Sequence, residues 1–107
     1  MTTSRAEDRR KHQRILLPED QFLNCKGLDP KFDGKVTVIG TGGLFIRTKQ
    51  SLSMGQKIRL KVEDPALNFE VQATVRDASE KGAGVEFDPL DNPHQRTLQA
   101  FLSKLRP

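Results

Sequence analysis

The residues best suited to chemistry lie near the N-terminus, in the densest run of cations in the chain. The run is Arg9-Arg10-Lys11-His12-Gln13-Arg14, and the first apolar run, residues 15–17, follows it directly. Arginine presents a planar fork of donors that matches phosphate oxygens and the O6/N7 edge of guanine. Arg10 and Arg14 would be neighbours on one face of a helix, and in an extended segment they would share a side about 13 Å apart. Either geometry lets both hold one anionic ligand, although the run by itself also fits a solvated basic tail.

The charge of the chain is unevenly distributed. The first fourteen residues carry +3 of the net charge of +4, so the remainder is nearly neutral. A basic arm on a near-neutral body suits a compact anion better than a long nucleic-acid track. The chain also has no Tyr or Trp, and its phenylalanines fall mostly on inward positions of the predicted strands, which leaves no stacking platform for single-stranded nucleic acid. Nucleic acid is therefore not the predicted partner.

Motifs for catalysis or metal binding are not found in the sequence. His12 and His94 are far apart, and neither has ligand spacing to a partner. Gly40 and Gly42 begin a GxGxxG pattern, but Phe45 occupies its third glycine position. We therefore predict a protein that is not an enzyme and that needs neither a metal nor a cofactor.

Cys25 is the only cysteine, which excludes an intrachain disulfide and a Cys-based zinc site. Its place in a predicted strand indicates a small core residue rather than a reactive thiol.

Three features of the sequence bear on localisation. A single cysteine suits a reducing compartment. No apolar run approaches the length of a membrane span, and no apolar region follows the N-terminal cations as in a secretory signal. The sequence therefore predicts a cytoplasmic protein without a membrane segment.

The elements that must position the basic run are predicted to be short strands. The chain of 107 residues has the length of one domain. Residues 56–63 and 69–76 alternate between apolar and polar types, which is the period of half-buried antiparallel strands. A loop is expected at 27–34 and a tight glycine turn, with close backbone approach, at 40–43. Such closely spaced strands favour a small barrel or sandwich, and the remaining strands are expected at 21–26, 35–39, 44–48 and 84–87.

The C-terminus changes to a helical period. Asp91 or Asn92 can cap a helix, and Pro93 suits its first turn. The helix, predicted for residues 92–105, has one apolar face that must be buried against the open side of the barrel, formed by Leu98, Phe101, Leu102 and Leu105. The predicted organisation is a flexible arm at 1–14 and a single domain at 15–107.

In their order and spacing, these segments resemble the PilZ domain family from about Arg9 onward. Arg10 and Arg14 stand at the two arginine positions of the family's RxxxR arm, residues 42–48 resemble the strand after its second motif, and 82–87 resemble its closing strand. The resemblance implies an all-β fold, a six-stranded antiparallel β-barrel with a C-terminal α-helix. It also implies the bacterial second messenger cyclic di-GMP as the ligand.

The second family motif, DxSxxG, is degenerate in this chain. Its three defined positions fall on Val38, Gly40 and Gly43, and only the last matches. In the family the acid and the serine contribute polar contacts to a guanine, whereas Val38 offers no side-chain hydrogen bond. Thr41, one position out of register, can substitute only in part. The loss of two hydrogen bonds, of about 0.5–1.5 kcal/mol each and more where one partner is charged, would weaken binding by roughly tenfold to several hundredfold.

Two functions follow from the resemblance. The first is a cyclic di-GMP receptor or adaptor that orders its arginine arm on binding and signals to a protein partner, and the paired arginines favour it. The alternative is a PilZ-like protein-interaction module that binds cyclic di-GMP weakly or not at all, and Val38 and Gly40 favour that reading. For the receptor, the resemblance and the glycine turn indicate as ligand-binding residues Arg9, Arg10, Arg14, Gly40, Thr41 and Gly43.

Overall fold

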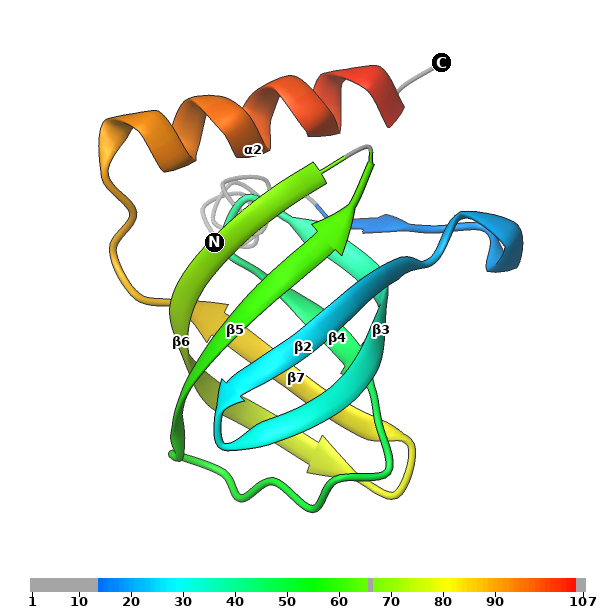
Figure 1. Ribbon diagram of the computed structural model, residues 1–107, viewed down its shortest axis with the longest axis vertical. Helices are drawn as coiled ribbons and strands as arrows, with labels where there is room; N and C mark the ends of the chain where they lie inside the picture. The colour runs from blue at the N-terminus through cyan, green and yellow to red at the C-terminus, as the bar shows by residue number, and fades with distance from the viewer. Residues whose placement is uncertain (1–13, 66, 106–107) are drawn as a thin grey trace, which may run out of the picture.

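The computed structural model describes residues 14–65 and 67–105, and most of these residues form one antiparallel sheet that closes on itself (Figure 1). Its main strands are β2 (Leu23–Asp29), β3 (Lys31–Gly40), β4 (Gly43–Arg47), β5 (Lys57–Asp64), β6 (Leu67–Ser79) and β7 (Gly82–Phe87). They hydrogen-bond in the order β3-β2-β5-β6-β7-β4, and a further β3–β4 pairing closes the ring. The predicted six-stranded antiparallel β-barrel is confirmed.

Strands β5 and β6 show how the alternating sequence produces the barrel. Ile58, Leu60 and Val62 are buried in the core, whereas Arg59 between them is exposed. In β6 the apolar residues from Leu67 to Val75 are buried in the same way. Because successive side chains of a strand point to opposite faces, this pattern gives each strand one core face and one solvent face.

The prediction of a loop at residues 27–34 is wrong, because β2 and β3 continue through this segment as a hairpin. Gly27 pairs with Phe32 and Cys25 pairs with Gly34, with the turn at the cis Asp29–Pro30 peptide. A Cβ atom at Gly27 would lie 2.3 Å from the ring of Phe32. The glycine therefore makes room for an aromatic ring on the paired strand, rather than marking a turn.

An additional strand, β1 (Arg14–Leu16), pairs with the end of β3. The backbone N–H of Leu17 extends this contact by donating to the carbonyl of Thr37 at 2.9 Å. A short 3-10 helix, η1 (Glu19–Gln21), then leads into β2. The sequence patterns did not predict β1, and the rest of the predicted flexible arm, residues 1–13, lies outside the described residues.

The C-terminal helix α2 (Asn92–Leu105) has the predicted bounds and lies across one end of the barrel (Figure 1). The Asp91 carboxylate caps it by accepting a hydrogen bond from the backbone N–H of His94 at 3.0 Å. This bond and a second one to the His94 ring lower the pKa of Asp91. The predicted apolar face packs on the core, with Leu105 partly buried and three residues fully buried, namely Leu98, Phe101 and Leu102.

Within the described residues, no helix has the length and apolar character that crossing a membrane would require.

Candidate ligand-binding site

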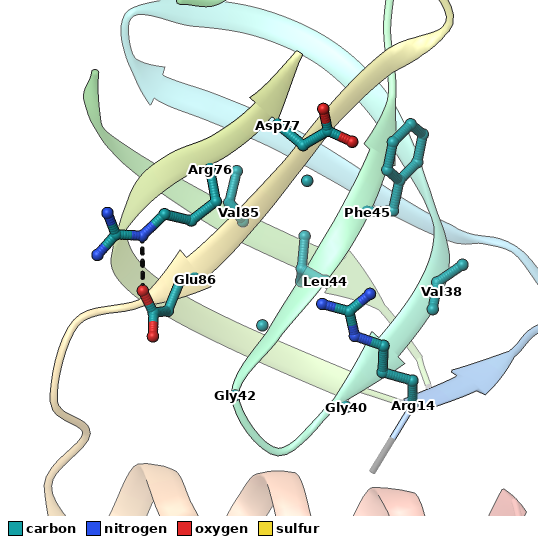
Figure 2. A pocket seen from close by; sticks show the side chains of 12 residues that line it. Arg14, Val38, Gly40, Gly42, Leu44, Phe45, Arg76, Asp77, Val85 and Glu86 are labelled. Carbon is teal, nitrogen blue, oxygen red and sulfur yellow. Dashed lines mark hydrogen bonds and ion pairs between the residues drawn. The ribbon is translucent and has the colours of Figure 1, made fainter. Parts of the chain in front are cut away.

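Several of the predicted binding residues meet at one hollow on the outer face of the barrel, which we call the outer pocket (Figure 2). Its volume is about 440 Å³. Strands β1, β3, β4, β6 and β7 all contribute to it. It is lined by Arg14, Val38, Gly40, Gly42, Gly43, Leu44, Phe45, Arg76, Asp77, Gly84, Val85 and Glu86.

Two glycines on neighbouring strands of the outer pocket have different roles. A Cβ atom at Gly43 would lie 2.0 Å from the carbonyl oxygen of Val85, so only glycine allows β4 to approach β7 this closely. A Cβ atom at Gly84 would meet only ordinary contacts, 3.5 Å from the Cβ of Asp77 and 3.8 Å from the ring of Phe45. Gly43 therefore serves the backbone packing, and Gly84 leaves empty space between two pocket side chains.

Two β-bulges set the side-chain register of the outer pocket. In β3 the pairing with β4 shifts between Val36 and Val38, and in β6 the pairing with β7 shifts between Val75 and Asp77. As a result, one row crosses four neighbouring strands in the order Val38, Phe45, Gly84 and Asp77. A bulge redirects the side chains that follow it, so the row faces outward rather than into the core.

Arg14 enters the outer pocket from its edge. Strand β1 places it opposite Gly40 in the ladder with β3. Its side chain is exposed, and the guanidinium group points over the pocket (Figure 2). No hydrogen bond or ion pair joins the Arg14 side chain to another residue in the part of the chain that the structure describes. Its donors are therefore available to a ligand.

The structure brings together some of the predicted site residues and not others. Arg14, Gly40 and Gly43 line the outer pocket. Thr41 lies instead in an adjacent hollow of about 290 Å³ between the barrel and α2. The structure does not test Arg9 and Arg10, which lie outside the described residues.

Sequence reasoning missed three charged residues of the outer pocket. Arg76 Nε lies 2.6 Å from Glu86 Oε1, and this exposed ion pair borders the pocket (Figure 2). Asp77 lies beside them on β6. Strict alternation would place Arg76 and Asp77 on opposite faces, but the bulge exposes both. Among the described residues, no group of three His, Cys, Asp or Glu side chains is arranged to hold a metal ion.

The fold and the sequence were compared with known proteins. Among solved structures, the PilZ domain with c-di-GMP of YcgR from Escherichia coli matches with a TM-score of 0.75 at 17% identity, over 91% of each chain. MotI/DgrA, an inhibitor of motility from Bacillus subtilis, matches with a TM-score of 0.67 at 21% identity, over 91% of this chain and 51% of that one. The MrkH–c-di-GMP complex from K. pneumonia matches with a TM-score of 0.71 at 16% identity, over 89% of this chain and 51% of that one.

The two latter proteins are thus about twice as long as the region they share with this chain. At these identities the structural matches establish the fold. No curated protein matches the sequence significantly. The sequence model of the PilZ domain, however, matches residues 8–104. Because that match spans nearly the whole sequence, the chain belongs to the PilZ domain family.

Proposed function

We propose that this PilZ domain is a receptor for cyclic di-GMP that acts by binding rather than by catalysis. The observation that carries the proposal is the pairing of Arg14 with Gly40, which brings an arginine of the RxxxR arm to the strand that holds the second motif. Gly43, the matching position of that motif, lines the same pocket. Solved structures of the same fold, the PilZ domain of YcgR and MrkH, contain c-di-GMP, which supports the choice of ligand.

The chemistry of the outer pocket suits a guanine nucleotide. The guanidinium fork of Arg14 can donate to phosphate oxygens or to the O6/N7 edge of guanine. The open glycine surface lets a flat base approach the backbone, and the half-buried ring of Phe45 offers an aromatic contact at its side. In this proposal Arg9 and Arg10 add further contacts as the arm becomes ordered over the ligand. The ordered arm then presents a changed surface to a protein partner.

A second candidate function rests on the apolar side of the pocket. Leu16 pairs with Val38, and Val38 pairs with Phe45, so three apolar side chains follow one another across β1, β3 and β4. Leu16 is 80% exposed. This strip favours a protein-interaction module in which contacts with another protein have replaced those with the nucleotide.

Calorimetric titration of the purified protein with cyclic di-GMP tests the proposal, with GMP as a control that carries one guanine and one phosphate. The receptor predicts saturable binding of cyclic di-GMP that is tighter than binding of GMP. Absence of binding at ligand concentrations of about 1 mM, where an interaction of only about 4 kcal/mol would be seen, would overturn the receptor and favour the interaction module.

A further inference from the structure

The outer pocket contains an unused carboxylate. Of its two acidic residues, Glu86 is engaged by Arg76 at 2.6 Å. The Asp77 side chain has no hydrogen bond or ion pair with any residue in the described ranges, and it is exposed. The ion pair largely neutralises Arg76 and Glu86, so the unpaired charges among the described lining residues of the outer pocket are Arg14 and Asp77.

Asp77 faces an open slot. It pairs with Gly84 on β7, and Gly84 pairs with Phe45 on β4, so the missing side chain of Gly84 leaves a gap between a carboxylate and an aromatic ring. A Cβ atom built on Gly84 would be 3.5 Å from Asp77 Cβ and 3.8 Å from Phe45 Cδ2, which shows that the gap is flanked directly by both residues. A flat ring that lies over Gly84 would therefore have the Asp77 carboxylate at its edge.

Arg14 lies on the opposite side of the same pocket. Strands β6, β7, β4, β3 and β1 are consecutive neighbours, so the backbones of Asp77 and Arg14 are separated by four strand spacings of about 4.8 Å. The Arg14 side chain extends back over the pocket toward Leu44 (Figure 2), and Asp77 is paired with Gly84 on β7. The outer pocket therefore carries a guanidinium group at one side and a carboxylate at the other.

Guanine has the complementary pair of edges. Its O6 and N7 atoms accept hydrogen bonds, and its N1–H and 2-amino group donate them. Adenine presents an acceptor at N1 and has no 2-amino group, so it cannot donate to a carboxylate in the same way. A carboxylate that accepts from two guanine donors makes charge-assisted hydrogen bonds, which are the stronger kind.

We propose that Asp77 determines the specificity for guanine by accepting hydrogen bonds from N1–H and the 2-amino group of a base whose O6/N7 edge faces Arg14. The inference rests on the proposed function, because it assigns a residue to the same pocket. In this assignment Asp77 of β6 supplies the acidic hydrogen-bond acceptor that Val38 cannot supply. The two residues stand at opposite ends of the row that crosses β3, β4, β7 and β6.

The test is a cycle that combines protein and ligand changes. The parent and Asp77→Ala are titrated with cyclic di-GMP and with cyclic di-IMP, which differs only by lacking both 2-amino groups. We expect Asp77→Ala to lower the affinity for cyclic di-GMP by about tenfold to a hundredfold. The parent should prefer cyclic di-GMP over cyclic di-IMP by about tenfold, and Asp77→Ala should bind the two ligands alike. Asp77→Asn, which keeps the shape but not the charge, should also lose most of this preference.

Glu70→Gln is the matched control, because Glu70 is an exposed acid on the same strand that lines a different hollow. It should leave both affinities unchanged, which excludes a general effect of net charge. Thermal unfolding of each variant should match the parent, since both side chains are exposed. If the parent binds cyclic di-GMP and Asp77→Ala keeps the full preference over cyclic di-IMP, the role of Asp77 is overturned while the receptor function stands. If the parent binds neither ligand, the receptor function fails and the inference fails with it.

Discussion

Arg14 lies directly opposite Gly40 in the antiparallel ladder between β1 and β3. The pairing joins the basic N-terminal run to the glycine turn through backbone hydrogen bonds, which do not require a ligand. The second arginine of the arm is therefore held beside the outer pocket before anything binds, and a ligand need not meet the entropy cost of ordering that residue.

Replacement of Arg14 tests the proposed ligand contact. Arg14→Ala should weaken the binding of cyclic di-GMP by about 1.5–3 kcal/mol, the range of a charge-assisted hydrogen bond. Arg14→Lys should recover only part of this loss, because an ammonium group lacks the planar fork. Calorimetry measures both, and Arg59→Ala, which removes an exposed cation from β5, is the control. Equal binding by parent and Arg14→Ala would remove Arg14 from the site.

Restoring the second motif separates the two candidate functions. Val38 is half-buried and lines the outer pocket, so an aspartate there is not placed in the core. Gly40 belongs to β3, whereas the positive φ angles of the described glycines are at Gly55 and Gly82. Val38→Asp with Gly40→Ser should therefore fold and tighten cyclic di-GMP binding by about 1–3 kcal/mol, through one or two recovered hydrogen bonds. Calorimetry and thermal unfolding are measured together, and a folded double variant that binds no ligand would favour the interaction module.

Replacement by alanine should affect stability at one glycine of the outer pocket and ligand binding at another. Gly43→Ala forces a methyl group to within 2.0 Å of the Val85 carbonyl oxygen, and it should destabilise the fold by about 1–3 kcal/mol or more. Gly84→Ala meets only ordinary contacts, so its stability should stay close to that of the parent. The new methyl group would nevertheless occupy the slot between Asp77 and Phe45 and should weaken ligand binding. Urea unfolding and calorimetry compare the two variants, and equal stabilities would contradict the close β4–β7 approach.

The buried thiol of Cys25 gives a prediction about alkaline pH. Burial, together with the negative charge of Glu63, raises the pKa of Cys25 from 9.0 to about 12. Above pH 9 the thiol ionises in the unfolded protein but stays neutral in the folded protein, which favours unfolding. The contribution of the neutral thiol to the free energy of unfolding is therefore full below pH 9 and is lost as the pH rises toward 12. The loss should be about 1.4 kcal/mol one pH unit above the unfolded pKa.

Urea unfolding of the parent and of Cys25→Ala at about pH 7 and about pH 10 isolates this effect from the titration of lysines, which both proteins share. At the higher pH, only the parent should show the additional decrease in the free energy of unfolding. A thiol reagent should also modify the native protein slowly and the unfolded protein rapidly, because Cys25 is only 2% exposed. Rapid labelling of the folded protein would contradict its burial.

Helix α2 should be required for a stable barrel. Leu98 is 1% exposed against the core, so Leu98→Ala should destabilise the fold by about 2–5 kcal/mol. The adjacent exposed Gln99 provides the control, and Gln99→Ala should have little effect. Truncation before Asp91 should cause unfolding or aggregation, measured by circular dichroism and light scattering. A truncated protein that stays monomeric and equally stable would show that the helix does not seal the core.

Local sequence patterns predicted most of the fold. Alternation located β5 and β6, and the change of period after Asp91 located α2, because both patterns depend on which face of one element is buried. The hairpin between β2 and β3 was missed, since glycine in a strand and glycine in a turn look alike until the paired residue, Phe32, is known.

The candidate site was less predictable because it depends on pairing between distant strands. Arg14 and Gly43 were predicted from the family motifs and Gly40 from the glycine turn, and the structure brings the three residues to one pocket. Asp77 could not have been found in that way. Its outward position follows from a bulge whose location is fixed by the register of β6 against β7, and no local pattern encodes that register.

The short strand β1 also affects whether the protein stays monomeric in solution. Strand β2 pairs with β3 only as far as Val36, and β1 covers the same side of β3 from Val38 to Gly40. If β1 were detached, these backbone groups would form an open edge beside the outer pocket, which is a template for a strand from another molecule. The three-residue strand that holds Arg14 beside the outer pocket therefore also protects the barrel from edge-to-edge polymerisation.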